Sequence, residues 1–155
     1  MGYVTMLFQF LAALLFSMVA GSVFGIWRGY DPTALSAASF LEMHQGAVHG
    51  LNVLLPGIAL VAILLTVALG WLARGKGAPF WLYLAAALLM VGAGVVTRFL
   101  NQPINAMVMG WSVETMPADW QALRAAWWNW HLFRTAFSIT AMAPLLAAII
   151  LDRPA

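Results

Sequence analysis

The chain has 155 residues, of which 64% are hydrophobic and only 8% are charged, and its mean hydropathy is +0.91. So few polar residues cannot cover a soluble globule, which predicts an integral membrane protein with the lipid bilayer as its main partner. The net charge is +2, and the sequence has no run of basic residues that would indicate nucleic-acid binding. The lack of cysteine excludes disulfides and thiolate chemistry.

Four stretches are long and apolar enough to cross a membrane as helices, which takes about 20 apolar residues. We therefore predict an all-α fold, an integral membrane four-helix bundle that forms one domain over residues 1–155. The first stretch is too long for the apolar part of a signal peptide and should be a retained helix. The second exceeds one crossing, so it tilts, bends at Pro56, or begins outside the hydrocarbon. The four spans cover residues 4–27, 40–73, 80–100 and 125–151.

Short polar turns join these spans, except for a long outer loop at residues 104–119 between the third and the fourth. This loop is either a lid over the bundle or an ordinary connection at the membrane surface. An even number of spans puts both chain ends on the side of Arg74 and Lys76, and basic loops stay in the cytoplasm. We therefore expect a bacterial inner-membrane protein with cytoplasmic termini. Gly21 and Gly25 have the spacing of close helix contacts, which serve either the bundle itself or a homo-oligomer.

Most ionisable residues inside the apolar stretches fall at the opposite end of the bundle, toward the outer leaflet. A charge in lipid costs roughly 2.5–3.5 kcal/mol, so we expect these residues to meet in one polar pocket. They form stripes spaced three or four residues apart: Glu42, Gln45, His49 and Asn52 on the second span, Arg98, Asn101 and Asn105 on and after the third, and Arg124, Trp127, His131, Arg134, Thr135 and Ser138 on the fourth. His44 points to nearly the opposite helix face from His49 and is left outside the predicted pocket.

Two chemistries suit this pocket, and the first is a metal site. Glu42, His49 and His131 are the residue types of a 2-His-1-carboxylate centre for non-haem iron, copper or zinc. However, Glu42 and His49 are roughly 10 Å apart along one helix, which is long for two ligands of one ion. A related alternative is a non-catalytic module that ligates haem through two histidines, or that holds a quinone or a lipid headgroup.

The second chemistry uses the arginines. Arg98, Arg124 and Arg134 outnumber the one intramembrane acid, Glu42, so an anionic ligand would balance the excess charge. That ligand is either lipid phosphate or the phenolate or enolate of a small apolar aromatic substrate. In the second case a histidine takes a proton near neutral pH and tryptophans form flat walls. Arg124, near the end of its span, also has the reach to snorkel to the headgroups.

Several motifs resemble those of small four-helix membrane proteins grouped with the fungal anthrone oxygenases. The most specific are Asn101-Gln-Pro-Ile-Asn105 and Arg124-Ala-Ala-Trp127 followed by His131-Leu-Phe-Arg134-Thr135, and further likeness lies in Gly29-Tyr-Asp-Pro32 and Glu42-Met-His-Gln-Gly-Ala-Val-His49-Gly-Leu-Asn52. The resemblance covers most of the chain. It implies an oxygenase that inserts molecular oxygen at an activated ring carbon of a phenolic polyketide, and it implies no particular cofactor. The site residues that it implies are Asn101, Asn105, Arg124, His131 and Arg134.

Together, the residues and the resemblance predict a membrane-embedded monooxygenase for an apolar aromatic, phenolic or quinol-like substrate. The substrate would enter from the lipid, an arginine would favour its anion, a histidine would take the proton, and the anion would react with oxygen without a cofactor. A metal ion held by Glu42, His49 and His131 would instead activate the oxygen. The predicted catalytic residues are His49, His131 and Arg134, and the predicted substrate-binding residues are Asn52, Arg98, Asn101, Asn105, Arg124 and Trp127.

Overall fold

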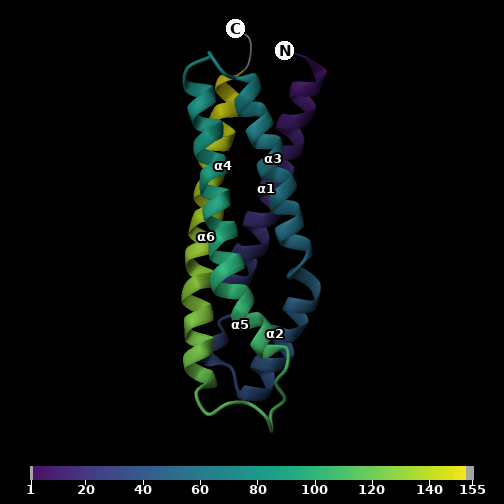
Figure 1. Cartoon of the computed structure of the whole chain (residues 1–155), viewed down its shortest axis with the longest axis vertical. Helices are drawn as coiled ribbons and strands as arrows, with labels where there is room; N and C mark the ends of the chain where they lie inside the picture. The colour runs from purple at the N-terminus through teal and green to yellow at the C-terminus, as the bar shows by residue number, and fades with distance from the viewer. Residues whose placement is uncertain (1, 153–155) are drawn as a thin grey trace.

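The computed structural model describes residues 2–152, and their backbone is almost entirely helical (Figure 1). The predicted all-α fold is confirmed, because no strand occurs among these residues. In chain order the elements are α1 (Tyr3–Gly29), the 3₁₀ turn η1 (Pro32–Ala34), α2 (Ala37–Leu51), α3 (Leu54–Leu72), α4 (Ala78–Val96), the π-helical turn η2 (Thr97–Asn101), α5 (Gln102–Val108) and α6 (Trp120–Leu151).

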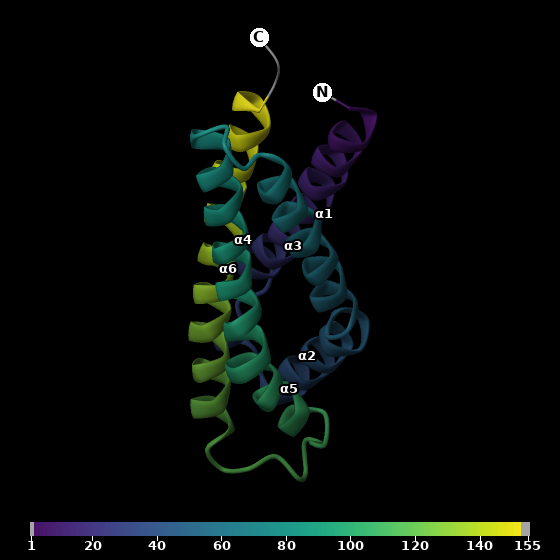
Figure 2. The ribbon, with the colours of Figure 1, turned by 45° about the horizontal axis from the view of Figure 1, so that its top comes forward.

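Four helical segments are long and apolar enough to cross a membrane, which identifies a membrane protein built as a four-helix bundle. The segments alternate in direction, so the start of α1, the turn between α3 and α4, and the end of α6 lie at one end of the molecule (Figure 1). α2 and α5 lie side by side at the other end (Figure 2). The four segments are Tyr3–Ala34, Leu54–Leu72, Ala78–Val108 and Trp120–Leu151.

The apolar stretch over residues 40–73 is divided in the structure. α2 ends at Leu51 and α3 begins at Leu54, so the chain turns between them. Pro56 lies in the first turn of α3, where a missing backbone N–H removes no helical hydrogen bond. Of the three explanations for the excess length of this stretch, the structure therefore shows a bend, just before Pro56. Apolar content alone does not reveal a change of helix axis.

The connection before α6 is shorter than the expected loop over residues 104–119. The difference arises because α5 continues as a helix to Val108, which leaves residues 109–119 as the irregular segment. Gln45 on α2 holds the start of this segment, since its Nε2 donates to the backbone oxygens of Val108 at 2.9 Å and Trp111 at 3.0 Å. The first residues of the connection are therefore anchored to α2.

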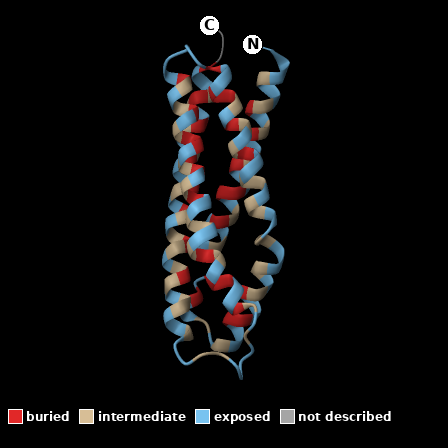
Figure 3. Ribbon diagram, viewed as in Figure 1, coloured by how far each residue is buried: buried red, intermediate tan, exposed pale blue. Residues whose placement is uncertain are grey.

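Small side chains on facing helices form much of the apolar core. Ala12, Ala62, Ala86, Ala141 and Ala148 are completely buried and come from α1, α3, α4 and α6. Small residues let helix backbones approach closely in a bilayer, where lipid tails are as apolar as the helices and burial gives no net drive for association. The outer faces of the helices are exposed (Figure 3), and many large apolar side chains cover them, as contact with lipid requires.

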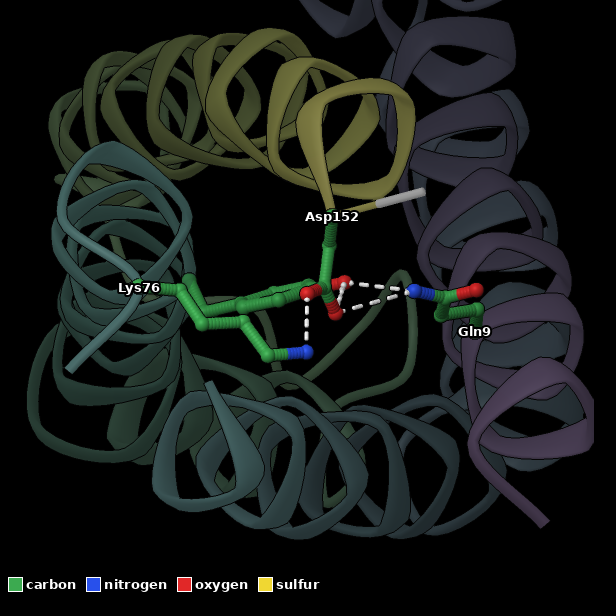
Figure 4. A network of polar contacts seen from close by, with 4 residues as sticks. Gln9, Lys76 and Asp152 are labelled. Atoms are coloured by element: carbon green, nitrogen blue, oxygen red, sulfur yellow. Dashed lines mark hydrogen bonds and ion pairs between the residues drawn. The ribbon is translucent and has the colours of Figure 1, made fainter. Parts of the chain in front are cut away.

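A polar network ties the helices together at the end opposite α2 (Figure 4). Its centre is Asp152, which follows α6 and is 5% exposed. Lys76 Nζ, from the turn between α3 and α4, lies 2.7 Å from Asp152 Oδ1. Gln9 Nε2 on α1 donates to Asp152 Oδ2 at 3.3 Å. The Tyr83 hydroxyl on α4 donates to the same oxygen at 3.4 Å and accepts from Gln9 Nε2 at 3.0 Å. One carboxylate thus joins segments from every part of the bundle.

Replacing Asp152 by alanine should lower the free energy of unfolding by about 1–3 kcal/mol, because Gln9 and Tyr83 would lose a buried acceptor. Denaturant titration of the purified protein in detergent micelles would measure this loss. Arg74→Gln is the matched control, since Arg74 lies in the same turn and bonds only to the backbone of Trp71. An Asp152→Ala variant as stable as this control would contradict a stabilising role for the network.

Candidate functional site

A cavity of about 270 Å³ lies inside the half of the bundle that contains α2 and α5. Its walls come from the second half of α1, the first half of α3, the second half of α4 with η2, the first half of α6, and both short helices. Most of the lining side chains are apolar. An apolar cavity with a few convergent polar groups is the usual form of a small-molecule site. The polar side chains at its wall include those of Tyr30, His44, Asn52, Arg98, Asn105 and Arg134.

Some residues that line the cavity, on α3 and at the end of α4, are also exposed on the outside of the bundle. Leu60 on α3 is 57% exposed, and Gly94 and Arg98 across from it are also exposed, yet all three line the cavity. A Cβ atom added to Gly94 would meet nothing within 4 Å. The exposure of these lining residues indicates that the cavity reaches the outer surface of the bundle between α3 and α4.

Asn105 on α5 is the centre of a hydrogen-bond network beside the cavity. Its Oδ1 lies 2.7 Å from Trp127 Nε1 and 3.2 Å from His44 Nε2. Its Nδ2 donates to Asn52 Oδ1 at 2.9 Å, and Gln102 Nε2 donates to the backbone oxygen of Asn52 at 3.3 Å. The network satisfies a buried amide and links α2, α5 and α6 at the break between α2 and α3.

The π-helical turn η2 sets the direction of two side chains at the site. Such turns occur mostly as single insertions in α-helices and are frequent at functional sites. Pro103 follows at the start of α5 and offers no N–H to the preceding turn, which favours irregular hydrogen bonding there. As a result Arg98 lines the cavity, whereas Asn101 faces α6 and its Nδ2 donates to the backbone oxygen of Trp127 at 3.0 Å.

His131 and Arg134 form a pair one turn apart on α6. Arg134 Nε donates to His131 Nδ1 at 3.0 Å, and His131 Nε2 lies 3.1 Å from the backbone oxygen of Val23 on α1. Both ring nitrogens of His131 are thus occupied, Nε2 as a donor and Nδ1 as an acceptor. The ring is completely buried and stacks on those of Trp127 and Trp128, at centroid distances of 5.3 and 5.4 Å. His131 therefore supports Arg134, which itself lines the cavity.

Positive charge at the cavity is not balanced by an acid. Arg98 and Arg134 line the cavity, and no aspartate or glutamate does. Within residues 2–152 the one salt bridge, between Lys76 and Asp152, belongs to the opposite end of the molecule. The site is consequently suited to an anion, or to a group that becomes an anion on binding.

Two polar atoms at the cavity wall have no hydrogen-bond partner in the described part of the chain. They are the Tyr30 hydroxyl and His44 Nδ1. Buried polar atoms are nearly always paired, so unpaired atoms beside a cavity point to a bound molecule. His44 is 1% exposed, and its ring packs against those of Phe40 and Trp127, at centroid distances of 5.1 and 4.7 Å. His44 thus lines the cavity with one ring nitrogen that has no hydrogen-bond partner among the described residues.

The structure gathers Asn52, Arg98, Asn105, Trp127 and Arg134, all expected from the sequence, at the wall of the cavity. The buried side chains of Asn101 and His131 lie behind this wall, where they contact the backbones of neighbouring helices.

Arg124, one of the expected substrate-binding residues, does not line the cavity. Its Nη1 donates to the backbone oxygen of Leu35 at 2.9 Å, and its guanidinium lies 4.6 Å from the centroid of the Trp120 ring. These contacts hold the connection between η1 and α2 against α6. The side chain is half-buried in protein contacts, which also differs from snorkelling to the headgroups.

Glu42 and His49 are also separated from the cavity. Both are exposed on α2, whereas the other two residues of the stripe face the protein, since Gln45 bonds to the segment after α5 and Asn52 lines the cavity. The ligand set of Glu42, His49 and His131 is therefore not brought together. Within residues 2–152, no three histidine, aspartate or glutamate side chains form a group that could hold a metal ion.

Sequence reasoning missed His44 and Tyr30. His44 shares one face of α2 with Phe40, Ala47 and Leu51, which are three, four or seven residues away. A single polar residue on the apolar face of an amphipathic helix was the signal that would have selected it. Tyr30 stands in the Gly29-Tyr-Asp-Pro32 motif, where its position at the end of α1 gave no sign of burial.

The family model of the anthrone oxygenases matches residues 45–144, which is more than half of the chain. The matched region contains the polar cavity residues on α3 to α6, while Tyr30 and His44 precede it. No curated protein and no solved structure matches the chain.

Acylation by diethyl pyrocarbonate should distinguish the three histidines of the chain. We expect His49 to react first because it is exposed, whereas burial protects His44 and His131. Peptide mass spectrometry of the protein in micelles would measure each rate, and a His49→Gln variant should lose the fast reaction. Equal rates at His44 and His49 would show that α2 is turned differently.

Proposed function

Because the chain belongs to the anthrone oxygenase family, we propose that it is a membrane-embedded monooxygenase for a small aromatic substrate with an acidic ring methylene or phenol. The observation that carries this proposal is the unpartnered Nδ1 of His44, in the same cavity as two arginines without acidic partners. A base and fixed positive charge in an apolar chamber are suited to forming a carbanion or phenolate. We therefore give the proposed role of base to His44, where the sequence suggested His49 or His131.

The proposed reaction converts an activated ring methylene, such as that of an anthrone, into a carbonyl group. His44 Nδ1 removes a proton from the methylene carbon. The electron pair is delocalised onto the carbonyl oxygen attached to the same ring, where Arg134 stabilises the negative charge. The carbon then bonds to molecular oxygen, and the resulting peroxide anion takes the proton back from His44 to become a hydroperoxide. The O–O bond breaks as the second hydrogen leaves the same carbon, and this hydrogen and the outer OH group depart as water. One oxygen atom remains in the carbonyl and the other leaves as water, so the reaction needs no external reductant.

The two residues on α6 have different tasks in this scheme. Arg134 lines the cavity and contacts the substrate anion, while His131 positions Arg134 by accepting from its Nε. Since both ring nitrogens of His131 are occupied, this histidine is a positioning residue and not the base. Oxygen dissolves readily in apolar environments, so the chamber needs no polar path to supply it.

The hydrogen-bonding groups of the cavity also define the substrate. His44 Nδ1 is the free base, whereas the guanidinium groups of Arg98 and Arg134 can only donate. A matching molecule therefore has one acidic hydrogen and at least one oxygen acceptor on an otherwise apolar ring system. Such a molecule partitions into lipid, which agrees with the lateral opening at Leu60 and Gly94.

Replacing His44 by glutamine should lower kcat by about 10²–10⁴-fold, the usual contribution of a general base. Oxygen consumption and quinone formation from an anthrone in proteoliposomes would measure the rate, with protein-free liposomes correcting for spontaneous oxidation. His49→Gln is the matched control and should keep the wild-type rate, because His49 lies outside the cavity. If the wild-type protein binds the anthrone but consumes no oxygen, a binding module replaces the oxygenase as the function.

Replacing Gly94 by phenylalanine should raise the KM several-fold while leaving kcat nearly unchanged, because the ring would narrow the opening between α3 and α4. Steady-state kinetics with the same anthrone would test this. Gly25→Phe on α1 is the control, since it is exposed with open space around it and does not line the cavity. An unchanged KM in Gly94→Phe would exclude this route of entry.

A further inference from the structure

The orientation of the Asn105 amide follows from a neighbour that can only donate. The indole nitrogen of Trp127 carries a hydrogen and no lone pair available for hydrogen bonding. The Asn105 atom at 2.7 Å from Trp127 Nε1 must therefore be the acceptor, Oδ1. This choice turns Nδ2 toward Asn52, whose Oδ1 accepts at 2.9 Å.

The same Asn105 oxygen determines which nitrogen of His44 carries the proton. Oδ1 lies 3.2 Å from His44 Nε2, and a carbonyl oxygen can only accept, so Nε2 must be the donor. A neutral imidazole has one N–H group, which leaves Nδ1 with a free lone pair. Nδ1 is also the atom without a partner. A doubly protonated ring would add a third cation to a cavity that already contains Arg98 and Arg134 and no acid.

We propose that Trp127 and Asn105 form a relay that fixes His44 in its Nε2–H tautomer and thereby keeps Nδ1 available to the substrate. Only the role of His44 as a base rests on the proposed function. The tautomer of His44 follows from the hydrogen bonds alone. Asn105 and Trp127 act through His44 and are positioning residues. Their contribution should appear in kcat more than in KM.

A role in packing alone would make a different prediction. Trp127 is 4% exposed and its ring contacts those of Tyr30 and His44, so a large aromatic ring is needed at this position for packing. Phenylalanine keeps a ring but removes the N–H group. Without that donor the side-chain amides of Asn105 and Asn52 can both flip by 180°, which exchanges their oxygen and nitrogen atoms. Nδ2 of Asn105 would then face His44. Nε2 would have to accept, and the proton would move to Nδ1.

Nitrogen NMR of the protein with ¹⁵N-labelled histidine, in detergent micelles, would report the tautomer directly. Three histidines give few signals, and the His44→Gln variant assigns those of His44. We expect wild-type His44 to be Nε2–H. Trp127→Phe and Asn105→Leu should each produce a population of the Nδ1–H form. Asn105→Asp should retain the Nε2–H form, because a carboxylate accepts from both Trp127 and His44.

The matched control for the tryptophan is Trp128→Phe, because Trp128 neighbours Trp127, also stacks on His131, and its Nε1 makes no hydrogen bond in the described part of the chain. This control should leave the tautomer unchanged. In oxygen-uptake assays, Trp127→Phe should lower kcat at least about tenfold while the KM changes little, and Trp128→Phe should keep the wild-type kcat.

The two readouts separate failure of the relay from failure of the proposed function. Wild-type His44 in the Nδ1–H form, or an unchanged tautomer in both Trp127→Phe and Asn105→Leu, would overturn the relay even if the protein is an active oxygenase. If the His44 tautomer changes in the variants as expected, the relay is supported whether or not the protein consumes oxygen. If the wild-type protein shows no oxygen uptake, the proposed function fails and the relay does not.

Discussion

A buried amide in an apolar bundle must find its partners inside the protein, and the candidate site depends on how Asn105 meets this requirement. An unsatisfied polar group in a medium of low dielectric constant is costly, so every donor near Asn105 has to face an acceptor. Trp127 on α6, His44 on α2 and Asn52 at the break between α2 and α3 supply those partners. The same contacts that stabilise the buried amide therefore also join three helices and orient an imidazole at the cavity.

The two ends of the bundle use polar groups differently. At one end Asp152 is surrounded by donors from α1, α4 and the turn between α3 and α4, which leaves its carboxylate fully engaged and closes the bundle. At the other end α2 and α5 sit beside a cavity whose arginines have no acidic partners and whose His44 retains a free nitrogen. A closed end that holds the helices in place allows the open end to keep unsatisfied groups for a ligand.

Helix α6 carries much of the site because its turns present polar groups to two different neighbours. Trp127 donates to Asn105 on α5, and His131, one turn later, bonds to the backbone of α1. Arg134 then rests on His131 and faces the cavity. The positive charge of Arg134 and the proposed base His44 thus come from separate helices, and the relative position of α2 and α6 sets the distance between them. The chain belongs to the anthrone oxygenase family, and the function proposed above uses this arrangement to activate an aromatic substrate toward oxygen.

The sequence by itself determined the membrane class and the all-α four-span bundle, because apolar length and helical period act locally along the chain. Asn52, Arg98, Asn105, Trp127 and Arg134 were expected in one pocket, and the packing of the helices places them at one cavity. The sequence could not determine which face of α2 turns inward. That choice depends on where the chain bends before Pro56, which leaves Glu42 and His49 exposed and turns His44 to the interior. The network of Asp152 likewise joins residues far apart in the chain, so only packing of the four helices decided it.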